Sequence, residues 1–106
     1  MLKRVKRRYL LLRLDGDCVL QEREFLDAVW RSVTQLYGEY GASFAGLALI
    51  DYDGDAKVAV LRVSLAALVS VRAALALVTR VTGHDVAVQV LGVSGTLKGL
   101  CAQLNA

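Results

Sequence analysis

The sequence predicts a single α+β domain over residues 1–106, with a four-stranded antiparallel sheet and helices packed on it. Three observations predict this class. The length is that of one domain, 56% of the residues are hydrophobic, and stretches that alternate with a period of two are interspersed with stretches of helical spacing. With 22% charged residues, the composition excludes a wholly disordered chain.

The first strand is expected over Arg7 to Asp15. Leucines at positions 10, 12 and 14 alternate with Tyr9, Leu11 and Arg13, so one face belongs to the core and the other points outward. Arg62 and Gln89 are expected on the same outward face, which is mixed enough to bind RNA or a protein. Leu11 on that face indicates a partner.

A helix follows the turn at Asp15-Gly16-Asp17, with acidic residues in its first turns. Its apolar residues recur at spacings of three and four, and we expect it to end near Gly38. A hairpin comes next, with strands over Ser43 to Tyr52 and Lys57 to Val63. Its turn contains Asp51, Asp53 and Asp55, but an EF-hand register would place Arg62 at the required glutamate, so a plain turn is favoured over a calcium loop.

The second helix is expected to begin after Ser64 as N-cap and to stop at Gly83. A strand over Asp85 to Val93, a turn over Gly92 to Gly95 and a short last helix complete the order β-α-β-β-α-β-α. This order is that of the ferredoxin-like, split βαβ arrangement, which RNA-recognition modules share. Their stacking signature is absent, because the expected third strand carries no aromatic residue.

The net charge of +3 is unevenly distributed. Residues 1–13 hold six basic residues and no acid, whereas the remainder holds seven basic and ten acidic residues. A basic arm over residues 1–8, leading into the first strand, is suited to a polyanion such as nucleic acid, although a solvated tail would have the same composition. The candidate contacts are Lys3, Arg4, Lys6, Arg7, Arg8, Tyr9 and Arg13.

The segment from Gly92 to Lys98 is the most distinctive motif. A glycine-rich turn from strand to helix can present backbone N–H groups to a phosphate, so Ser94, Gly95, Thr96 and Lys98 are further RNA-binding candidates. The alternative is a tight turn with Thr96 as N-cap. Neither a P-loop nor a nucleophile elbow is present.

The sequence offers no catalytic constellation and no metal site. His84 is the only histidine, and Cys18 and Cys101 lack a CxxC partner, so they are interpreted as packed thiols. No export signal is evident, and arginines interrupt the most apolar stretch, Val58 to Val81. We expect a cytoplasmic protein that does not enter a membrane.

The basic segment leading into Arg8-Tyr9-Leu10-Leu11, together with Leu91-Gly92-Val93-Ser94-Gly95-Thr96-Leu97-Lys98, resembles the archaeal and eukaryotic ribonuclease P protein subunit family, called protein component 2 in archaea. The resemblance covers nearly the whole chain. It implies a non-catalytic subunit of the ribonucleoprotein that removes the 5′ leader of precursor tRNA. The active site is then expected in the ribonuclease P RNA.

The same resemblance implies the partners. They are the ribonuclease P RNA, a TIM-barrel-like ribonuclease P protein subunit and, indirectly, precursor tRNA, with a homodimer inside an assembly of two copies of each protein as a further expectation. No cofactor is expected on this chain, because the magnesium ions belong with the catalytic RNA. From the residues alone, a ferredoxin-like ligand-binding or oligomerisation module without RNA affinity stays open as the alternative. Acylphosphatase-like hydrolysis is disfavoured, because its arginine-phosphate loop is missing.

Overall fold

The computed structural model describes residues 6–17 and 19–104, with side chains described except at positions 43, 44 and 101–104. The elements, in chain order, are β1 (Arg7–Gly16), α1 (Glu22–Phe44), β2 (Ala48–Asp53), β3 (Val58–Ser64), the 3-10 turn η1 (Leu65–Ala67), α2 (Leu68–Ala76), β4 (Arg80–Val81), β5 (His84–Ser94) and α3 (Leu97–Leu104). The strands form one antiparallel sheet in the order β2-β3-β1-β5-β4. The α+β class is confirmed.

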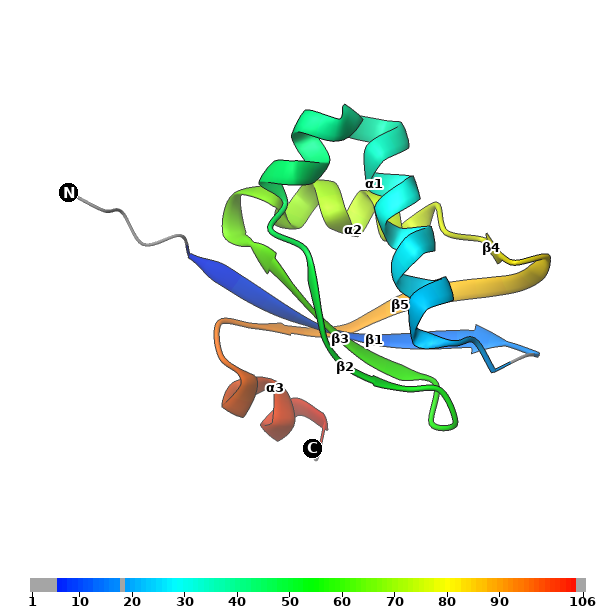
Figure 1. Cartoon of the computed structure of the whole chain (residues 1–106). Helices are drawn as coiled ribbons and strands as arrows, with labels where there is room; N and C mark the ends of the chain where they lie inside the picture. Colours follow the sequence, from blue (N-terminus) through cyan, green and yellow to red (C-terminus); the bar gives the residue numbers. More distant parts are fainter. Residues whose placement is uncertain (1–5, 18, 105–106) are drawn as a thin grey trace.

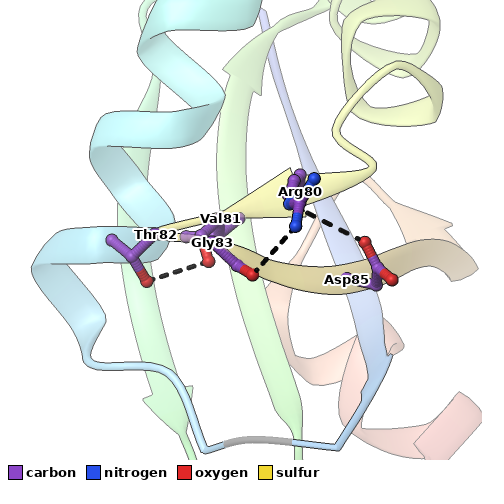
Figure 2. A network of polar contacts seen from close by, with 5 residues as sticks. All are labelled: Arg80, Val81, Thr82, Gly83 and Asp85. Carbon is purple, nitrogen blue, oxygen red and sulfur yellow. Dashed lines mark hydrogen bonds and ion pairs between the residues drawn. The ribbon is translucent and has the colours of Figure 1, made fainter.

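The predicted strand count was wrong by one. The two-residue strand β4 pairs with the start of β5, Arg80 opposite Asp85 and Val81 opposite His84. The hairpin that joins them places Thr82 at φ 49° and Gly83 at φ 84°, which are the two positive φ values of a type I′ turn. Figure 2 shows this hairpin, in which the Thr82 hydroxyl lies 2.8 Å from the carbonyl oxygen of Val81.

The prediction that the second helix ends at Gly83 is therefore wrong. Helix α2 stops at Ala76, and the following residues extend toward β4. Ser64 stands at the expected N-cap position of η1, but its side chain makes no capping hydrogen bond. Gly83 has a positive φ because the hairpin turn requires one. The residue that ends a helix often needs a positive φ as well, so glycine suits both positions.

Helix α1 also differs from its predicted end. Gly38 has φ 77° and ψ 171°, which breaks the helix, yet helical turns resume after it and continue to Phe44. Glycine tolerates this conformation, so the chain changes direction there without leaving the helical layer. The extra turns shorten the next strand, which was expected from Ser43 and begins at Ala48.

The core lies between the sheet and α1 with α2. Leu10, Leu12 and Leu14 of β1 are buried, as the alternation predicted, and they pack in one cluster with Phe25, Val29 and Val33 of α1. Leu61 and Val63 of β3 and Val71 and Leu75 of α2 belong to the same cluster. Figure 1 shows both helices on one side of the sheet.

Helix α3 covers part of the opposite side (Figure 1), where it contacts β1 and β5. Leu11, expected on an open outward face, is only 3% exposed, and Leu100 of α3 is equally buried. The expectation of an exposed Leu11 was therefore wrong, because a helix of the same chain lies over that part of the sheet. No helix among the described residues is long and apolar enough to cross a membrane.

Candidate nucleic-acid interface

The basic arm enters the fold at the start of β1, in the middle of the sheet. Lys6 and Arg7 are exposed, while Arg8 and Tyr9 are half-buried. The backbone anchors this point on one side, because the Leu65 amide donates to the carbonyl oxygen of Lys6 at 2.8 Å. Lys3 and Arg4, the first two predicted contacts, lie outside the described residues.

The antiparallel pairing of β1 with β5 brings the arm and the glycine-rich turn together. Tyr9 pairs with Ser94, so the first described basic residues lie beside the end of β5. Arg8 reaches the turn itself: a Cβ at Gly95 would lie 3.4 Å from Arg8 Nη1 and 3.7 Å from its Cζ. Arg8 Nη1 also donates to the carbonyl oxygen of Arg7 at 2.9 Å. Two motifs from opposite ends of the sequence thus form one surface.

The turn is shorter than predicted, because β5 extends to Ser94 and only Gly95 and Thr96 separate it from α3. Thr96 is the N-cap of α3: its Oγ1 accepts from the Gly99 amide at 3.0 Å. The Thr96 amide in turn donates to the Ser94 hydroxyl at 3.3 Å. The capping interpretation of this segment therefore has direct structural support, whereas a phosphate contact by the turn stays a prediction.

Gly95, which lies beside Arg8, is exposed, and so are Thr96 and Lys98, which follow it in the chain. Gly99 is held close to the same turn, since a Cβ there would clash with the Ser94 hydroxyl oxygen. The exposed cations of this surface are Lys6, Arg7 and Lys98. An arrangement of this kind suits phosphate oxygens, which accept hydrogen bonds from lysine and arginine side chains and from backbone amides.

Arg13 is separate from this surface. It lies five residues after Arg8 on β1, and its Nε forms an ion pair with Asp15 Oδ1 at 3.2 Å, with the Arg13 side chain 60% exposed and that of Asp15 43% exposed. Asp15 offers Arg13 a carboxylate that competes with any phosphate. The structure therefore places Arg13 on the predicted strand but away from the turn.

Arg62 lies next to the candidate surface, which the sequence alone did not predict. It pairs with Tyr9 across β1 and β3, so the two side chains lie on the same face of the sheet. Its Nε is buried and has no hydrogen-bond partner among the described residues. The alternation of β3 placed Arg62 outward, but only the register showed that it faces Tyr9.

The opposite end of β1 is acidic. Asp53 Oδ1 accepts from the amides of Asp55 and Ala56 at 3.1 and 3.0 Å, which fixes the turn between β2 and β3 as the sequence favoured. The Lys57 ammonium group donates to the Gly16 carbonyl oxygen and ties this turn to β1.

Within the described part of the chain, no group of three His, Cys, Asp or Glu residues could hold a metal ion. Cys18 and the Cys101 side chain lie outside the described residues and side chains.

Comparison with known proteins identifies the family of this chain. Residues 8–104 match the family described as the Rpp14/Pop5 family. Proteins named ribonuclease P protein component 2 are similar over most of their length. The protein of Thermococcus gammatolerans is 32% identical, covering 92% of this chain and 81% of the relative. That of Archaeoglobus fulgidus is 36% identical, with 90% and 84% covered.

A solved structure shows the same fold. A chain in the cryo-EM structure of yeast ribonuclease MRP superposes with a TM-score of 0.73 at 12% sequence identity, covering 99% of this chain and 95% of that one. At this identity the likeness concerns the fold. It extends over β4 and α3 as well, the two elements that depart from a four-stranded sheet with helices on a single face.

Proposed function

The chain belongs to the Rpp14/Pop5 family and is a protein subunit of ribonuclease P, and from this premise we propose that it supports the catalytic RNA in removing the 5′ leader of precursor tRNA. The match to the family favours this function over the ligand-binding module that the sequence left open. In the proposed role the chain contributes no catalytic residue. The RNA holds the magnesium ions and the active site.

One observation carries the RNA-binding part of the proposal: Arg8 lies against Gly95, so the basic start of β1 and the Ser94–Lys98 turn form one exposed surface. We propose that Lys6, Arg7, Arg8 and Lys98 contact phosphates there, with Tyr9, Ser94, Gly95 and Thr96 at the centre of the surface. Lys3 and Arg4 would extend it along the arm. Arg13 contributes less, because Asp15 already pairs with it.

The proposed assembly also contains a TIM-barrel-like ribonuclease P protein subunit and accommodates two copies of each protein. It works in the cytoplasm on precursor tRNA. In the proposed assembly the protein partner leaves the surface around Arg8 free for RNA.

The test is reconstitution of precursor-tRNA cleavage by the cognate RNA and the TIM-barrel-like subunit, with and without this chain, at low and moderate magnesium. Stimulated removal of the 5′ leader is expected, most clearly at low magnesium. No stimulation, with the chain folded and the other components competent, would overturn the proposal.

The salt dependence of RNA affinity tests the surface. Each lost phosphate contact lowers the magnitude of the slope of log K against log salt by about 0.7 for single strands and about 0.9 for a B-form duplex. The triple variant Lys6→Ala, Arg7→Ala, Arg8→Ala is expected to flatten the slope by about 2. The matched control is Arg23→Ala, an exposed arginine on α1. An unchanged slope in the triple variant would remove these residues from the interface.

A further inference from the structure

Arg62 is a half-buried cation without a counter-ion. Its Nε is buried and has no hydrogen-bond partner among the described residues, and no ion pair within that part of the chain includes its guanidinium group. A buried N–H that loses water without gaining a partner costs free energy. A partly dehydrated cation also attracts an anion more strongly than a cation in water does. The free chain therefore leaves Arg62 in a state that a bound anion would relieve.

The sheet register identifies the neighbours of Arg62 on the side that faces α3. Tyr9 of β1 lies opposite it on one flank, and Ala48 of β2 lies opposite it on the other. Arg7 pairs with Ser64 and is the diagonal neighbour of Arg62, about 7–8 Å away, which is within reach of long side chains. Arg7, Tyr9 and Arg62 together are called here the Tyr9–Arg62 site. It combines one aromatic ring with two positive charges.

The segments that form this end of the sheet contain no acidic residue. The sequence has none at positions 1–14, 40–50, 56–84 and 86–106, which include the start of β1, the start of β2, all of β3, the end of β5 and α3. Figure 1 shows the start of β1 and the ends of β3 and β5 at one end of the sheet, away from the β2–β3 turn and the β4–β5 hairpin.

The acids of the chain lie elsewhere. The first acid of β2 is Asp51, which pairs with Val60, and its Oδ1 accepts from the Tyr52 amide at 2.9 Å. Glu39 belongs to α1, on the opposite side of the sheet. Arg7 and Arg62 therefore repel each other with no carboxylate of this end of the sheet between them, and an anion placed there would stabilise both.

The Tyr9–Arg62 site is continuous with the surface around Arg8 and Gly95. Tyr9 pairs with Arg62 on one flank and with Ser94 on the other, so it stands between β3 and the turn that leads into α3. Neighbouring strands are about 4.8 Å apart, which puts Arg62 and Ser94 about 10 Å apart across β1. An RNA strand bound at the turn can reach Arg62 with its next nucleotides.

We propose that the Tyr9–Arg62 site binds one unpaired nucleotide of the RNA, with the base stacked on the Tyr9 ring and the phosphate held between Arg62 and Arg7. This inference rests on the proposed function and adds to it the kind of nucleotide that is bound and a further contact residue, Arg62. Aromatic side chains stack on bases that are unpaired, because the faces of paired bases are covered by their neighbours in the helix. The planar guanidinium group of arginine can offer a phosphate two parallel N–H donors.

A carboxylate of a protein would also neutralise Arg62. It would leave the Tyr9 ring and the connection to the turn unused, whereas a nucleotide engages the ring, the two arginines and the neighbouring surface at once. The chemistry of the site therefore favours RNA, and a protein is the alternative that the test separates from it.

The test measures the affinity of the full-length chain for the cognate ribonuclease P RNA at one moderate salt concentration. Arg62→Met keeps the length of the side chain and removes its N–H groups, so RNA binding should weaken about tenfold or more. Its midpoint of urea unfolding should be no lower than that of the wild type, because the unpartnered Nε is gone. The matched control is Arg23→Met, an exposed arginine on α1, which should change the affinity less than twofold.

Variants of Tyr9 test the stacked base. Tyr9→Leu should weaken RNA binding at least about fivefold, the loss expected for one stacked base, whereas Tyr9→Phe keeps the ring and should bind within about twofold of the wild type. Acylation of the RNA 2′-hydroxyl groups locates the nucleotide, since it reports flexible positions. The wild type and Tyr9→Phe should protect one nucleotide of an unpaired segment that Tyr9→Leu leaves reactive.

Each other result overturns the proposal. Wild-type RNA affinity in both Arg62→Met and Tyr9→Leu would exclude the site, and a lower unfolding midpoint of Arg62→Met would show that Arg62 stabilises the free chain. If Arg62→Met weakens binding of the TIM-barrel-like subunit and not of RNA, a protein carboxylate is the occupant. Stimulation of precursor-tRNA cleavage by the wild-type chain is measured separately, so the proposed function can stand while this site fails. A wild-type chain without RNA affinity would overturn both.

Discussion

Arg8 and Gly95 touch across the junction of β1 and β5, with Arg8 Nη1 3.4 Å from the place where a Cβ of residue 95 would stand. A Cβ alone would make an ordinary van der Waals contact with the guanidinium, whereas a larger branched side chain at residue 95 would push the guanidinium away. The contact joins the two motifs that were predicted separately from the sequence. Mutations at either residue can therefore test the geometry of the candidate RNA surface.

Replacing Gly95 with valine is expected to displace Arg8 and lower RNA affinity several-fold with little effect on stability, since residue 95 is exposed. RNA affinity is measured for Gly95→Val, Arg8→Ala and the double variant. The two effects should not add, because the glycine acts through the arginine. Strictly additive losses would show that Gly95 contributes through some other contact.

Leu11→Ala is expected to destabilise the fold by about 2–5 kcal/mol, because its side chain is buried on the α3 side of the sheet. Urea denaturation gives the free energy of unfolding. Leu91→Ala is the matched control, a leucine that is 49% exposed, and surface substitutions stay within about 0.5 kcal/mol. Equal effects of the two variants would mean that α3 does not cover Leu11 in solution.

Thr96→Ala removes the oxygen that accepts from the Gly99 amide, and a lost N-cap of this kind costs about 1 kcal/mol. Thr96→Ser retains the hydroxyl and should keep most of the stability. The midpoint of urea unfolding separates the two variants. If alanine and serine behave alike, the cap does not contribute to holding α3.

The stability is expected to decline at alkaline pH partly through Tyr52. Burial, followed by Glu24 and Glu22, raises the pKa of Tyr52 above its ordinary value of 10.0. Its hydroxyl donates to the Leu20 carbonyl oxygen, so the fold favours the neutral phenol. This contribution is complete below pH 10 and is lost as the pH rises through the raised pKa.

Tyr52→Phe is the measurement for that contribution. Lacking the hydroxyl, it should be less stable than the wild type near neutral pH by about 1 kcal/mol and lose less stability above pH 10. The same fall in both proteins would show that the alkaline loss does not come from Tyr52.

Local patterns were enough to predict the strands of the central sheet and the two main helices. The leucine alternation of β1 and the helical spacing from Phe25 to Val33 are properties of contiguous residues, and both describe the core correctly. The errors arose where distant contacts decide. Gly83, predicted to stop the second helix, turns a hairpin instead, whereas Gly38 does end the first helical segment of α1 but is followed by further helical turns.

The sequence was enough to predict which residues belong to the candidate surface, but not that they lie close together in space. The basic arm and the Ser94–Lys98 turn were visible as motifs, but their proximity follows from the β1–β5 register, which no local pattern contains. The burial of Leu11 was missed for the same reason, because period-two alternation cannot tell an open face from one that a later helix covers.

The central position of β1 also affects how the protein emerges from the ribosome. Its neighbours are β3 and β5, so Tyr9 can pair with Arg62 once β3 has been made, but it finds its second partner only when Ser94 has been made. Until then Leu10 and Leu12, fully buried in the finished fold, lie on a strand with one unpaired edge. Pairings this distant in sequence form slowly and leave apolar strands open to aggregation. Translation must therefore be nearly complete before β1, which follows the arm, is paired on both edges. Chains truncated before β5 should need chaperones to stay in solution.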